Sequence, residues 1–406
     1  MAQDWTQTID DEISARNGEI SAINKQIHSH PELAYEEHQA HDALVATLQS
    51  LGFDVRPHAY GLATAFSTEF GSGGRLVVFN AEYDALPGIG HACGHNLIAS
   101  SSLASFLGVA AALKASGLPG RVRLLGTPAE EGGGGKLKLI AAGAYAGAAA
   151  SLMVHPGPGH VLEGGVRGVA FVRMLANVKM RAYFAGREAH AAIAPWDGVN
   201  ALDAVCLAYN AVSMLRQQTR PYERIHGVFR AAGDRPNVTP AECCVEYYVR
   251  SATRAGAERL WQRVLKCFEG AALATGCELR TEPLNSYADV RPSPALCRAY
   301  VDAARPAGSV AYADPPDFLA GSTDMGDVCY ECPGFHGAFG IDTAEGDANH
   351  TKGFAAAAGT EDAYQRALEC GRAMALVGWK VLVDDVFADE MHREWLTDMK
   401  LAAEGK

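Results

Sequence analysis

Apolar residues recur at helical spacing near the start of the chain and again near its end. Between residues 7 and 50, isoleucine, leucine and valine repeat every three or four positions, and the pattern breaks at His30-Pro31. This spacing predicts two helices separated by the proline. A similar spacing over residues 360–376 predicts one final helix.

Between these ends, short apolar runs alternate with helical stretches. Leu76–Phe79 and residues 121–127 and 150–154 each predict a buried strand, while residues 97–117 predict a helix rich in small side chains. Strands that alternate with helices typically form a largely parallel sheet. We therefore expect an α/β domain in this part of the chain.

The pattern changes near residue 171. Partial alternation of apolar and polar residues predicts strands at 172–184, 227–229 and 244–249. Amphipathic patterns predict helices at 200–215 and 257–274. With 406 residues, of which 48% are hydrophobic, the chain is long enough for two cores. We expect an α+β domain over residues 171–288, inserted into a mostly parallel α/β domain formed by residues 1–170 and 289–406.

Composition and charge disfavour several classes of partner and setting. The formal net charge of −12 argues against nucleic acid or an anionic membrane surface as a partner. The first residues do not resemble a signal peptide, and we expect no apolar run of roughly 18 residues that could span a membrane, so a cytoplasmic protein is predicted. The ten cysteines are then expected to be reduced. Cys329-Tyr-Glu-Cys332 precedes Pro333-Gly334 instead of lying beside a βα unit, which disfavours a redox pair.

Potential metal ligands follow each of the three predicted strands. They are Asp84, His91, Cys93 and His95 after the first strand, Glu130 and Glu131 after the second, and His155 after the third. In open α/β sheets, binding sites form beyond the carboxyl ends of the strands, so these side chains can converge. Thiolate, imidazole and carboxylate groups are the ligands that zinc prefers. The pattern therefore predicts a metal site at this edge of the sheet.

Simpler interpretations compete with the metal site. A reduced core cysteine beside a hydrogen-bonded histidine would explain Cys93 and His95 alone. Gly132–Gly135 followed by Lys136 could suggest a phosphate loop, but the Gly-x-x-x-x-Gly-Lys-Ser/Thr pattern is missing, and the glycines more simply let the backbone pass close to the metal site. Far downstream, His350 adds a fifth potential ligand, and five N, S and O ligands would suit two zinc-like ions.

Eight short motifs occur in an order that is typical of one known family. They are His30-Pro-Glu-Leu, Tyr83-Asp-Ala-Leu-Pro87, Gly90-His-Ala-Cys-Gly-His95, Thr127-Pro-Ala-Glu-Glu-Gly132, His155-Pro156, Ala189-His-Ala-Ala192, Asn237-Val-Thr-Pro240 and His350-Thr351. Over nearly its whole length, the chain resembles the aminoacylase-type metallopeptidases and amidohydrolases of peptidase family M20. It is most similar to the amidohydrolase branch, in which a cysteine is a metal ligand. Asn96, where that branch usually has aspartate, and Gly321-Ser-Thr-Asp324 resemble the aminoacylase-like, Xaa-Arg dipeptidase-type subgroup.

The resemblance implies a role for each matching residue of the first domain. The implied metal ligands are Cys93, which bridges two ions, His95 and His155, which complete one site, and Glu131 and His350, which complete the other. Glu130 matches the general base, which takes a proton from the attacking water and later gives it to the leaving amine. Asp84 matches the aspartate that orients a metal-binding histidine.

For the inserted domain, the resemblance implies a lid that also forms a homodimer. His190 would reach the active site of the partner subunit and stabilise the oxyanion there. Asn237 and Arg250 match residues that hold the free carboxylate of the substrate, a task for which the guanidinium fork of arginine is well suited.

The resemblance thus implies a metal-dependent amidohydrolase with two divalent ions, zinc or else manganese or cobalt. Its substrate would be a small molecule, either an N-acyl amino acid or a dipeptide with a free carboxylate. Two alternatives stay open. In the first, the same groups remove an acyl group from a specialised small-molecule amide, or synthesise such an amide. In the second, the chain is a catalytically silent relative that acts as a scaffold.

Overall fold

The computed structural model describes residues 5–308, 310–312 and 319–406, and they divide into two compact units. The first unit contains residues 5–173, 290–312 and 323–400, and the second contains residues 174–289, 319–322 and 401–406. The second unit is therefore inserted into the first, and two short segments from later in the chain also pack with it.

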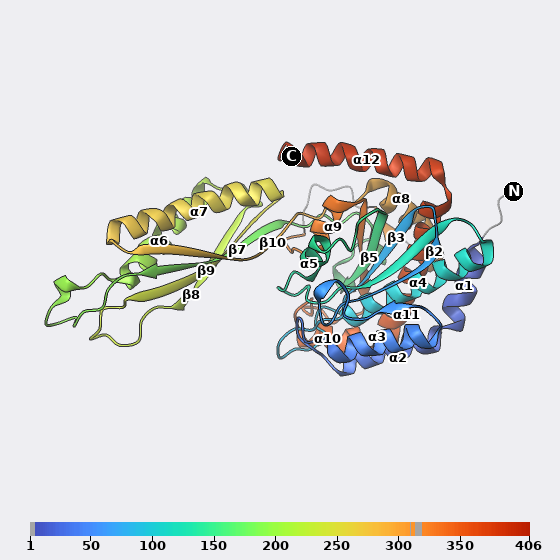
Figure 1. Cartoon of the computed structure of the whole chain (residues 1–406), viewed down its shortest axis with the longest axis horizontal. Coiled ribbons are helices and arrows are strands. Elements are labelled where there is room, and N and C mark those ends of the chain that lie inside the picture. The colour runs from blue at the N-terminus through green and yellow to red at the C-terminus, as the bar shows by residue number, and fades with distance from the viewer. Residues whose placement is uncertain (1–4, 309, 313–318) are drawn as a thin grey trace. The chain divides into compact units, whose positions relative to one another are not determined.

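The first unit is built on an eight-stranded sheet (Figure 1). In spatial order its strands are β1 (Val55–Arg56), β2 (Phe66–Ser72), β4 (Gly120–Gly126), β3 (Leu76–Ala81), β5 (Ala148–Pro158), β12 (Gly334–Ile341), β6 (Gly168–Val169) and β11 (Val310–Ala311). The central strands β4, β3, β5 and β12 are parallel to one another. β1 and β2 pair antiparallel with their neighbours, whereas β6 is antiparallel to β12 and parallel to β11. The predicted, mostly parallel α/β sheet is confirmed.

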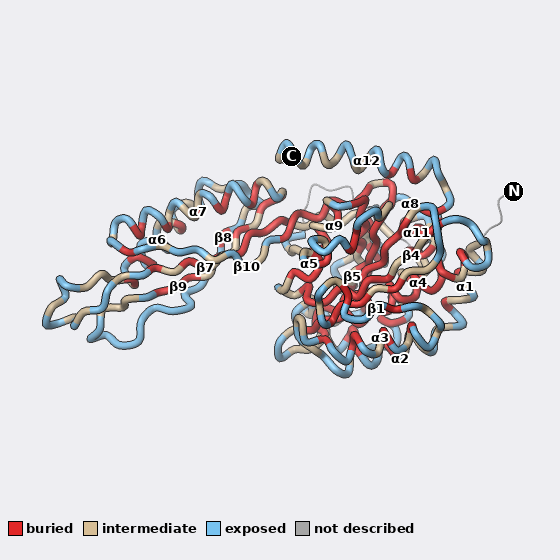
Figure 2. The backbone as a smooth tube through the Cα atoms, in the orientation of Figure 1, coloured by how far each residue is buried: buried red, intermediate tan, exposed pale blue. Residues whose placement is uncertain are grey.

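Helices cover both faces of this sheet, because the side chains of a strand alternate between its faces. Val77, Phe79 and Ala81 of β3 belong to the larger core, whereas Leu76 and Val78 belong to a smaller core on the other face. The helices of the larger core are α1 (Thr6–Ala15), α2 (Asn17–Ser29), α3 (His38–Ser50), α4 (His95–Ser116), α8 (Pro294–Ala304), α10 (Lys352–Ala358), α11 (Glu361–Val383) and α12 (Asp385–Ala403). The helices of the smaller core are α5 (Gly135–Ala141) and α9 (Met325–Glu331). Figure 2 shows that β3, β5 and α4 are buried along most of their length.

Several predicted elements differ from the observed ones. Three helices form where the sequence predicted two, because the backbone leaves the helical conformation at Arg16, which separates α1 from α2. The last predicted helix continues to Val383 and is followed by α12 (Asp385–Ala403). Contrary to expectation, α4 is apolar and long enough to cross a membrane, but 94% of its most apolar window is buried, as in the core helix of a domain.

The second unit consists of a four-stranded antiparallel sheet with two helices on one face. The strand order is β10 (Glu278–Tyr287), β7 (Ala176–Ala185), β9 (Glu242–Ser251) and β8 (Arg224–Ala231), and the helices are α6 (Ala201–Leu215) and α7 (Arg254–Thr275). Asn200 and Thr253 cap the two helices by accepting hydrogen bonds from the first-turn backbone. The helices and the inner face of the sheet share one core, in which Phe184, Tyr247 and Phe268 are buried. The predicted α+β character of this region is confirmed.

Single turns of 3-10 helix occur in loops of both units. They are η1 (Ala59–Gly61), η2 (Gly159–Val161), η3 (Pro195–Asp197), η4 (Arg216–Gln218) and η5 (Arg305–Ala307). Of these, η3 lies in the loop that follows His190. Most of the predicted site residues lie on loops of the two units, while His95 begins α4, His155 lies in β5 and Arg250 lies in β9.

Candidate metal centre

The predicted ligands of the first unit lie at or beyond the carboxyl ends of three neighbouring strands. His95 is the first residue of α4, directly after the loop that follows β3, and Glu130 and Glu131 lie in the loop after β4. The third predicted strand continues past His155 to Pro158, so this histidine lies within β5. Because the four central strands run in parallel, these positions share one edge of the sheet.

Cys93 belongs to two groups of potential ligands. Its ligand atom lies within 4.8 Å of those of His95 and His155, and also within 4.8 Å of those of Glu131 and His350. In the first group, Cys93 Sγ is 3.4 Å from His155 Nε2. In the second, His350 Nε2 is 3.2 Å from Glu131 Oε1. The five potential ligands thus fall into two groups that share the Cys93 thiol, and the family resemblance implies the same assignment of ligands to two metal ions.

Local backbone conformation brings these residues together. Gly94 has φ +74°, and a Cβ there would lie only 2.6 Å from Pro156 Cγ, so the turn between Cys93 and His95 requires glycine. His350 adopts φ +71°, which is uncommon for a residue with a side chain, and its backbone N–H donates to Ala92 O over 2.8 Å. This hydrogen bond ties the distant His350 loop to the Cys93 turn.

The hydrogen bonds of two histidines leave their Nε2 atoms available as ligands. His95 Nδ1 donates to Asp84 Oδ1 over 3.0 Å, and His155 Nδ1 donates to Pro156 O over 2.8 Å. With the proton on Nδ1, each Nε2 carries a lone pair. His95 Nε2 is buried and has no hydrogen-bond partner among the residues that the structure describes. A metal ion would satisfy it, so these residues fit a metal centre.

The protonation of Cys93 points the same way. Burial raises the pKa of its thiol to about 12. At neutral pH the thiol would stay protonated on its own, and only a nearby cation can stabilise the thiolate that a metal site needs. A buried thiol with two imidazoles and a carboxylate around it is therefore suited to a metal cation.

Glu130 lies beside the ligands but differs from them electrostatically. One of its oxygens lies within 4.8 Å of ligand atoms of His95 and Glu131. Burial and the charges of Glu82, Glu131 and Asp324 raise the pKa of Glu130 well above its usual range. A carboxylate with a raised pKa can accept a proton and release it again, as a general base requires.

Buried carboxylates hold the backbone of the loop that carries Glu130 and Glu131. Asp84 Oδ2 accepts from Glu131 N over 2.8 Å, so Asp84 fixes this loop as well as the ring of His95. Glu37 Oε1 accepts from Ala129 N over 2.8 Å. Ala129 itself has φ +61°, a conformation that persists only where its surroundings impose it. The sequence offers no signal for this contact of Glu37, because acidic residues are common at the start of a helix.

Several histidines near the predicted site have other positions. His91 is buried and its ring stacks on that of His28, with centroids 6.2 Å apart, and it joins neither ligand group. His336 is buried on β12, and its ring lies 5.7 Å from that of His155. Its burial is what the sequence pattern of β12, with apolar neighbours, would favour.

His190 and Asn237 lie together on exposed loops of the second unit. Ala191 N donates to Asn237 O over 3.1 Å, and Thr239 N donates to Ala189 O over 3.0 Å. His190 Nδ1 accepts hydrogen bonds from the backbone N–H groups of Ala192 and Ile193. The neutral ring therefore carries its proton on Nε2, where it can be donated outward.

Arg250 is not brought together with Asn237 within one chain. Asn237 precedes the first residue of β9 and Arg250 is the ninth residue of that strand, which places them about 25 Å apart at the usual rise per residue. Arg250 is half-buried, donates to Ser322 Oγ over 2.6 Å and to His226 Nε2 over 3.4 Å, and pairs with none of the carboxylates that the structure describes. An unpaired guanidinium in this setting is suited to an external anion. His226 and Ser322 carried no sequence signal for this contact.

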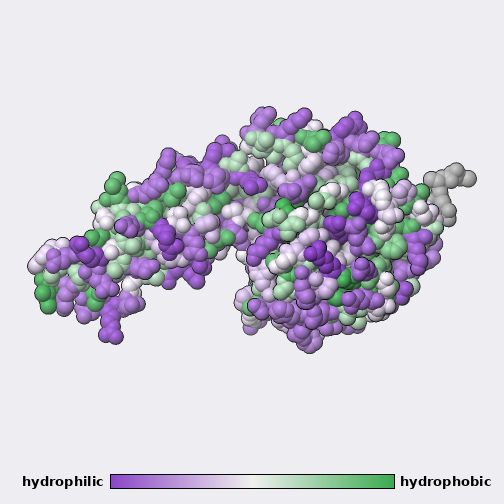
Figure 3. Space-filling view, viewed as in Figure 1, coloured by the Kyte–Doolittle hydropathy of each residue, from purple (hydrophilic) through white to green (hydrophobic). Residues whose placement is uncertain are grey.

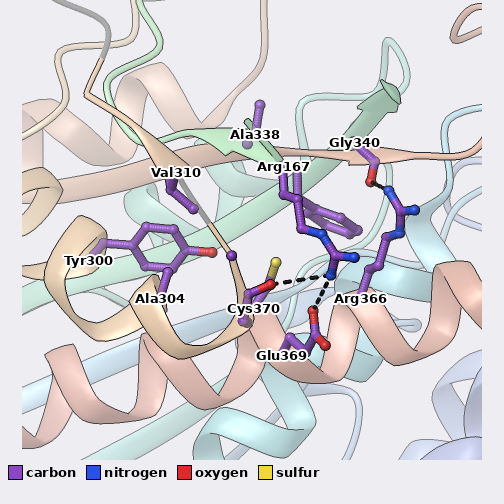
Figure 4. A pocket seen from close by; sticks show the side chains of 13 residues that line it. Arg167, Tyr300, Ala304, Val310, Ala338, Gly340, Arg366, Glu369 and Cys370 are labelled. Atoms are coloured by element: carbon purple, nitrogen blue, oxygen red, sulfur yellow. Dashed lines mark hydrogen bonds and ion pairs between the residues drawn. The ribbon is translucent and has the colours of Figure 1, made fainter. Parts of the chain in front are cut away.

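A pocket elsewhere in the first unit contains none of the predicted site residues (Figure 4). Its two arginines are already engaged. Arg366 donates to Gly340 O over 2.8 Å and pairs with Asp342, and Arg167 pairs with Glu369 at 3.4 Å. These contacts stabilise the fold around β12 and leave little free charge for a ligand.

Comparison with known proteins identifies the family. The profile of peptidase family M20/M25/M40 matches residues 78–375. The chain belongs to peptidase family M20. Within this family it is 38% identical to the Xaa-Arg dipeptidase of Mus musculus, over 93% of this chain and 88% of the relative, and 37% identical to that of Homo sapiens, over 94% and 89%. It is also 33% identical to one of the two p-aminobenzoyl-glutamate hydrolase chains of Escherichia coli, over 67% of this chain and 59% of that one.

Solved structures of the family share the fold. A dinuclear metal binding M20 peptidase of Bacillus subtilis superposes with a TM-score of 0.64 at 21% identity, covering 91% of this chain and 99% of the other. The aminobenzoyl-glutamate utilization protein of Klebsiella pneumoniae gives 0.68 at 22% identity, covering 91% and 98%. This M20 chain is therefore a hydrolase of amide bonds, from a family with dinuclear metal sites.

Proposed function

We propose that this M20 enzyme cleaves the amide bond of a dipeptide or N-acyl amino acid that bears a free carboxylate. The observation that carries the proposal is the pair of ligand groups that share Cys93, with Glu130 beside them. The proposed metal ligands are Cys93, His95, Glu131, His155 and His350. Zinc suits this mixture of sulfur, nitrogen and oxygen ligands, and manganese or cobalt are the alternatives.

Glu130 is the proposed general base. Divalent ions held by these residues would supply Lewis-acid activation of the attacking water and of the amide carbonyl. Glu130 would take the proton from the water and deliver it to the leaving nitrogen, and its raised pKa suits both steps. Asp84 would keep the His95 ring in its ligand orientation through the 3.0 Å hydrogen bond.

The second unit would complete the site from a second copy of the chain. Asn237 lies before the start of β9 and Arg250 lies near its end, so one chain does not bring both to a single small carboxylate. In a homodimer, Arg250 of one subunit and the His190–Asn237 loops of its partner can meet at one substrate. His190 would then donate from Nε2 to the carbonyl oxygen as negative charge develops there.

The surface of the second unit supports such a dimer. β8 is an edge strand of its sheet, with Val228 and Phe229 exposed. On α6, Leu207 and Met214 are also exposed. Figure 3 shows apolar patches among the polar surface of the second unit. An exposed apolar edge strand invites pairing with a second copy, because its backbone groups lack partners on one side.

The substrate class proposed first is a dipeptide with a carboxy-terminal arginine or lysine. It rests on the Xaa-Arg dipeptidases, which align over most of their own length. An acyl amino acid such as p-aminobenzoyl-glutamate is the second candidate, on the basis of the Escherichia coli relative. Both have the free carboxylate that Arg250 would bind.

A substrate panel tests the proposal. The protein is stripped of metal, reloaded with Zn²⁺, Mn²⁺ or Co²⁺, and assayed with Xaa-Arg, Xaa-Lys and Xaa-Glu dipeptides, N-acetyl amino acids and p-aminobenzoyl-glutamate. We expect metal-dependent cleavage, fastest with the basic dipeptides, and loss of cleavage when the carboxylate is amidated. If metal-loaded protein cleaves no member of the panel, the alternatives of a specialised amide or a silent scaffold replace this proposal.

A further inference from the structure

A fully buried lysine lies next to the metal centre and has no part in the chemistry proposed so far. Lys136 Nζ is 2.5 Å from Glu82 Oε1 and 2.6 Å from Asp324 Oδ1, and all three side chains have no exposed surface. A buried ammonium group is costly unless it is paired and hydrogen-bonded. Although burial lowers the pKa of Lys136, the charges of Asp324 and Glu82 outweigh it and raise this pKa well above its usual range. The lysine is therefore charged, and its two carboxylates compensate it.

The three residues come from three separate segments that surround the centre. Glu82 follows β3 and precedes the Cys93 turn, Lys136 lies in the first turn of α5, and Asp324 directly precedes α9. Asp324 Oδ2 also accepts from the backbone N–H of Lys136 over 2.9 Å. Asp324 thus fixes both the main chain and the side chain of Lys136.

Lys136 ends the loop that carries the proposed base and one ligand. Between Glu131 and Lys136 lie four glycines, which have no side chains with which to hold the loop. The backbone is nevertheless tightly folded, since a Cβ on Gly135 would lie 1.7 Å from Pro128 O. Asp84 and Glu37 hold the beginning of the loop, and Tyr35 donates to Gly133 O over 2.6 Å. At its far end, Gly135 N donates to Ala129 O over 3.3 Å, and the contacts of Lys136 with Glu82 and Asp324 are the side-chain contacts there.

We propose that Lys136 is a positioning residue, which locks the loop bearing Glu130 and Glu131 onto the end of β3 and onto the segment before α9 through its contacts with Glu82 and Asp324. The importance of Lys136 for turnover rests on the proposed function of Glu130, whereas its hold on the loop does not. A displacement of about 1 Å in a catalytic group can cost on the order of 100-fold in rate, so loss of this lock should affect turnover more than substrate binding.

The test separates the lock from simple charge balance. Lys136→Met removes the ammonium group and leaves two buried carboxylates, so it will also lose stability. Lys136→Met/Glu82→Gln restores the original net charge of the triad without restoring the lock. Lys114→Met, an exposed lysine in the last turn of α4, is the matched control.

Hydrogen exchange of the zinc-loaded proteins reports on the loop without any substrate. The amides of Ala129, Glu131 and Lys136 all donate to buried carboxylates, so their exchange follows the loop position. In the double variant we expect roughly 10-fold faster exchange over residues 128–136, with exchange in α4 unchanged. We also expect kcat to fall roughly 10- to 100-fold, with KM within about 3-fold and zinc content unchanged.

Two results would overturn the proposal. Wild-type exchange over residues 128–136 in the double variant would show that Lys136 does not hold the loop. Recovery of kcat together with stability would show that only charge balance matters. If wild-type protein turns over no substrate, the proposed function fails by itself, and the exchange measurement still decides whether Lys136 holds the loop.

Discussion

The metal centre of the first unit and the exposed loops of the second unit differ in how much of a site one chain provides. In the first unit, the ligand atoms within each group lie within 4.8 Å of one another, and buried carboxylates hold the loop that carries Glu130 and Glu131. In the second unit, His190 and Asn237 are exposed, and Arg250 lies at the other end of β9. The comparison teaches that the proposed metal ligands converge within one unit of a single chain, whereas the residues proposed to bind the substrate carboxylate do not.

The largest effect should come from removal of the metal ions that the ligand groups of the first unit are proposed to hold. After dialysis against a chelator we expect turnover to fall by more than about 1,000-fold, and to return on addition of Zn²⁺, Mn²⁺ or Co²⁺. Cys93→Ser should weaken metal binding by at least about 10-fold, because this side chain belongs to both ligand groups. Metal content and turnover of the same samples are the measurements. Full turnover by metal-free protein would contradict the account.

In the exposed loops of the second unit, the substitution His190→Ala should reduce kcat by about 100- to 1,000-fold, because one hydrogen-bond donor to the oxyanion is lost. Metal content and the circular dichroism spectrum should stay unchanged, because the side chain is exposed and lies outside all three cores. His160→Ala, another exposed histidine, is the control. Equal kcat values for the two variants would remove His190 from the mechanism.

Mixed dimers sharpen the comparison further. If His190 acts across the interface, a dimer of one Glu130→Gln subunit and one His190→Ala subunit has one intact site. Random re-association of equal amounts of the two inactive proteins should then restore about a quarter of wild-type turnover in a two-fold symmetric dimer. If His190 acts within its own subunit, every site of the mixture is defective and no turnover returns.

The smallest expected effect concerns Glu37, a buried residue of the first unit. Burial and the charge of Asp84 raise the pKa of Glu37 from its usual value to about 7. The neutral form is favoured in the folded state, so its contribution to the free energy of unfolding is present at acid pH and lost as the pH rises to above about 7. Relative to Glu37→Gln, wild type should lose about 3 kcal/mol between pH 4.5 and pH 8.

Denaturant unfolding at several pH values measures this difference. Glu36→Gln, an exposed neighbour, should follow wild type at each pH. If the curves of wild type and Glu37→Gln stay parallel over this range, Glu37 does not carry the shifted pKa.

The two regions also differ in how well the sequence predicted them. The convergence of Cys93, Glu131 and His155 follows from topology, because parallel strands end at one edge and ligands follow each strand. The Lys136 triad could not be predicted, since its three members are distant in sequence and each is ordinary on its own. Sequence shows a lysine after four glycines, whereas only the fold shows that this lysine is buried between two carboxylates.

The second unit shows a different limit. Asn237 and Arg250 are thirteen positions apart in the sequence, and the family resemblance implies that both hold the carboxylate of the substrate. The structure places nearly the whole of an extended strand between them, and extended residues separate side chains by about 3.3 Å each. Sequence motifs alone do not show which subunit contributes each residue of a shared site.

The most direct test of the account compares two neighbouring glutamates, Glu130→Gln and Glu131→Gln. If Glu130 is the base and Glu131 a ligand, Glu130→Gln keeps two equivalents of metal per chain and loses about 1,000-fold in kcat, whereas Glu131→Gln loses metal at matched free concentration. Metal content and turnover of the two purified variants, measured side by side, give the answer. A Glu130→Gln variant that is as active as wild type, or that loses metal as Glu131→Gln does, would contradict the central claim.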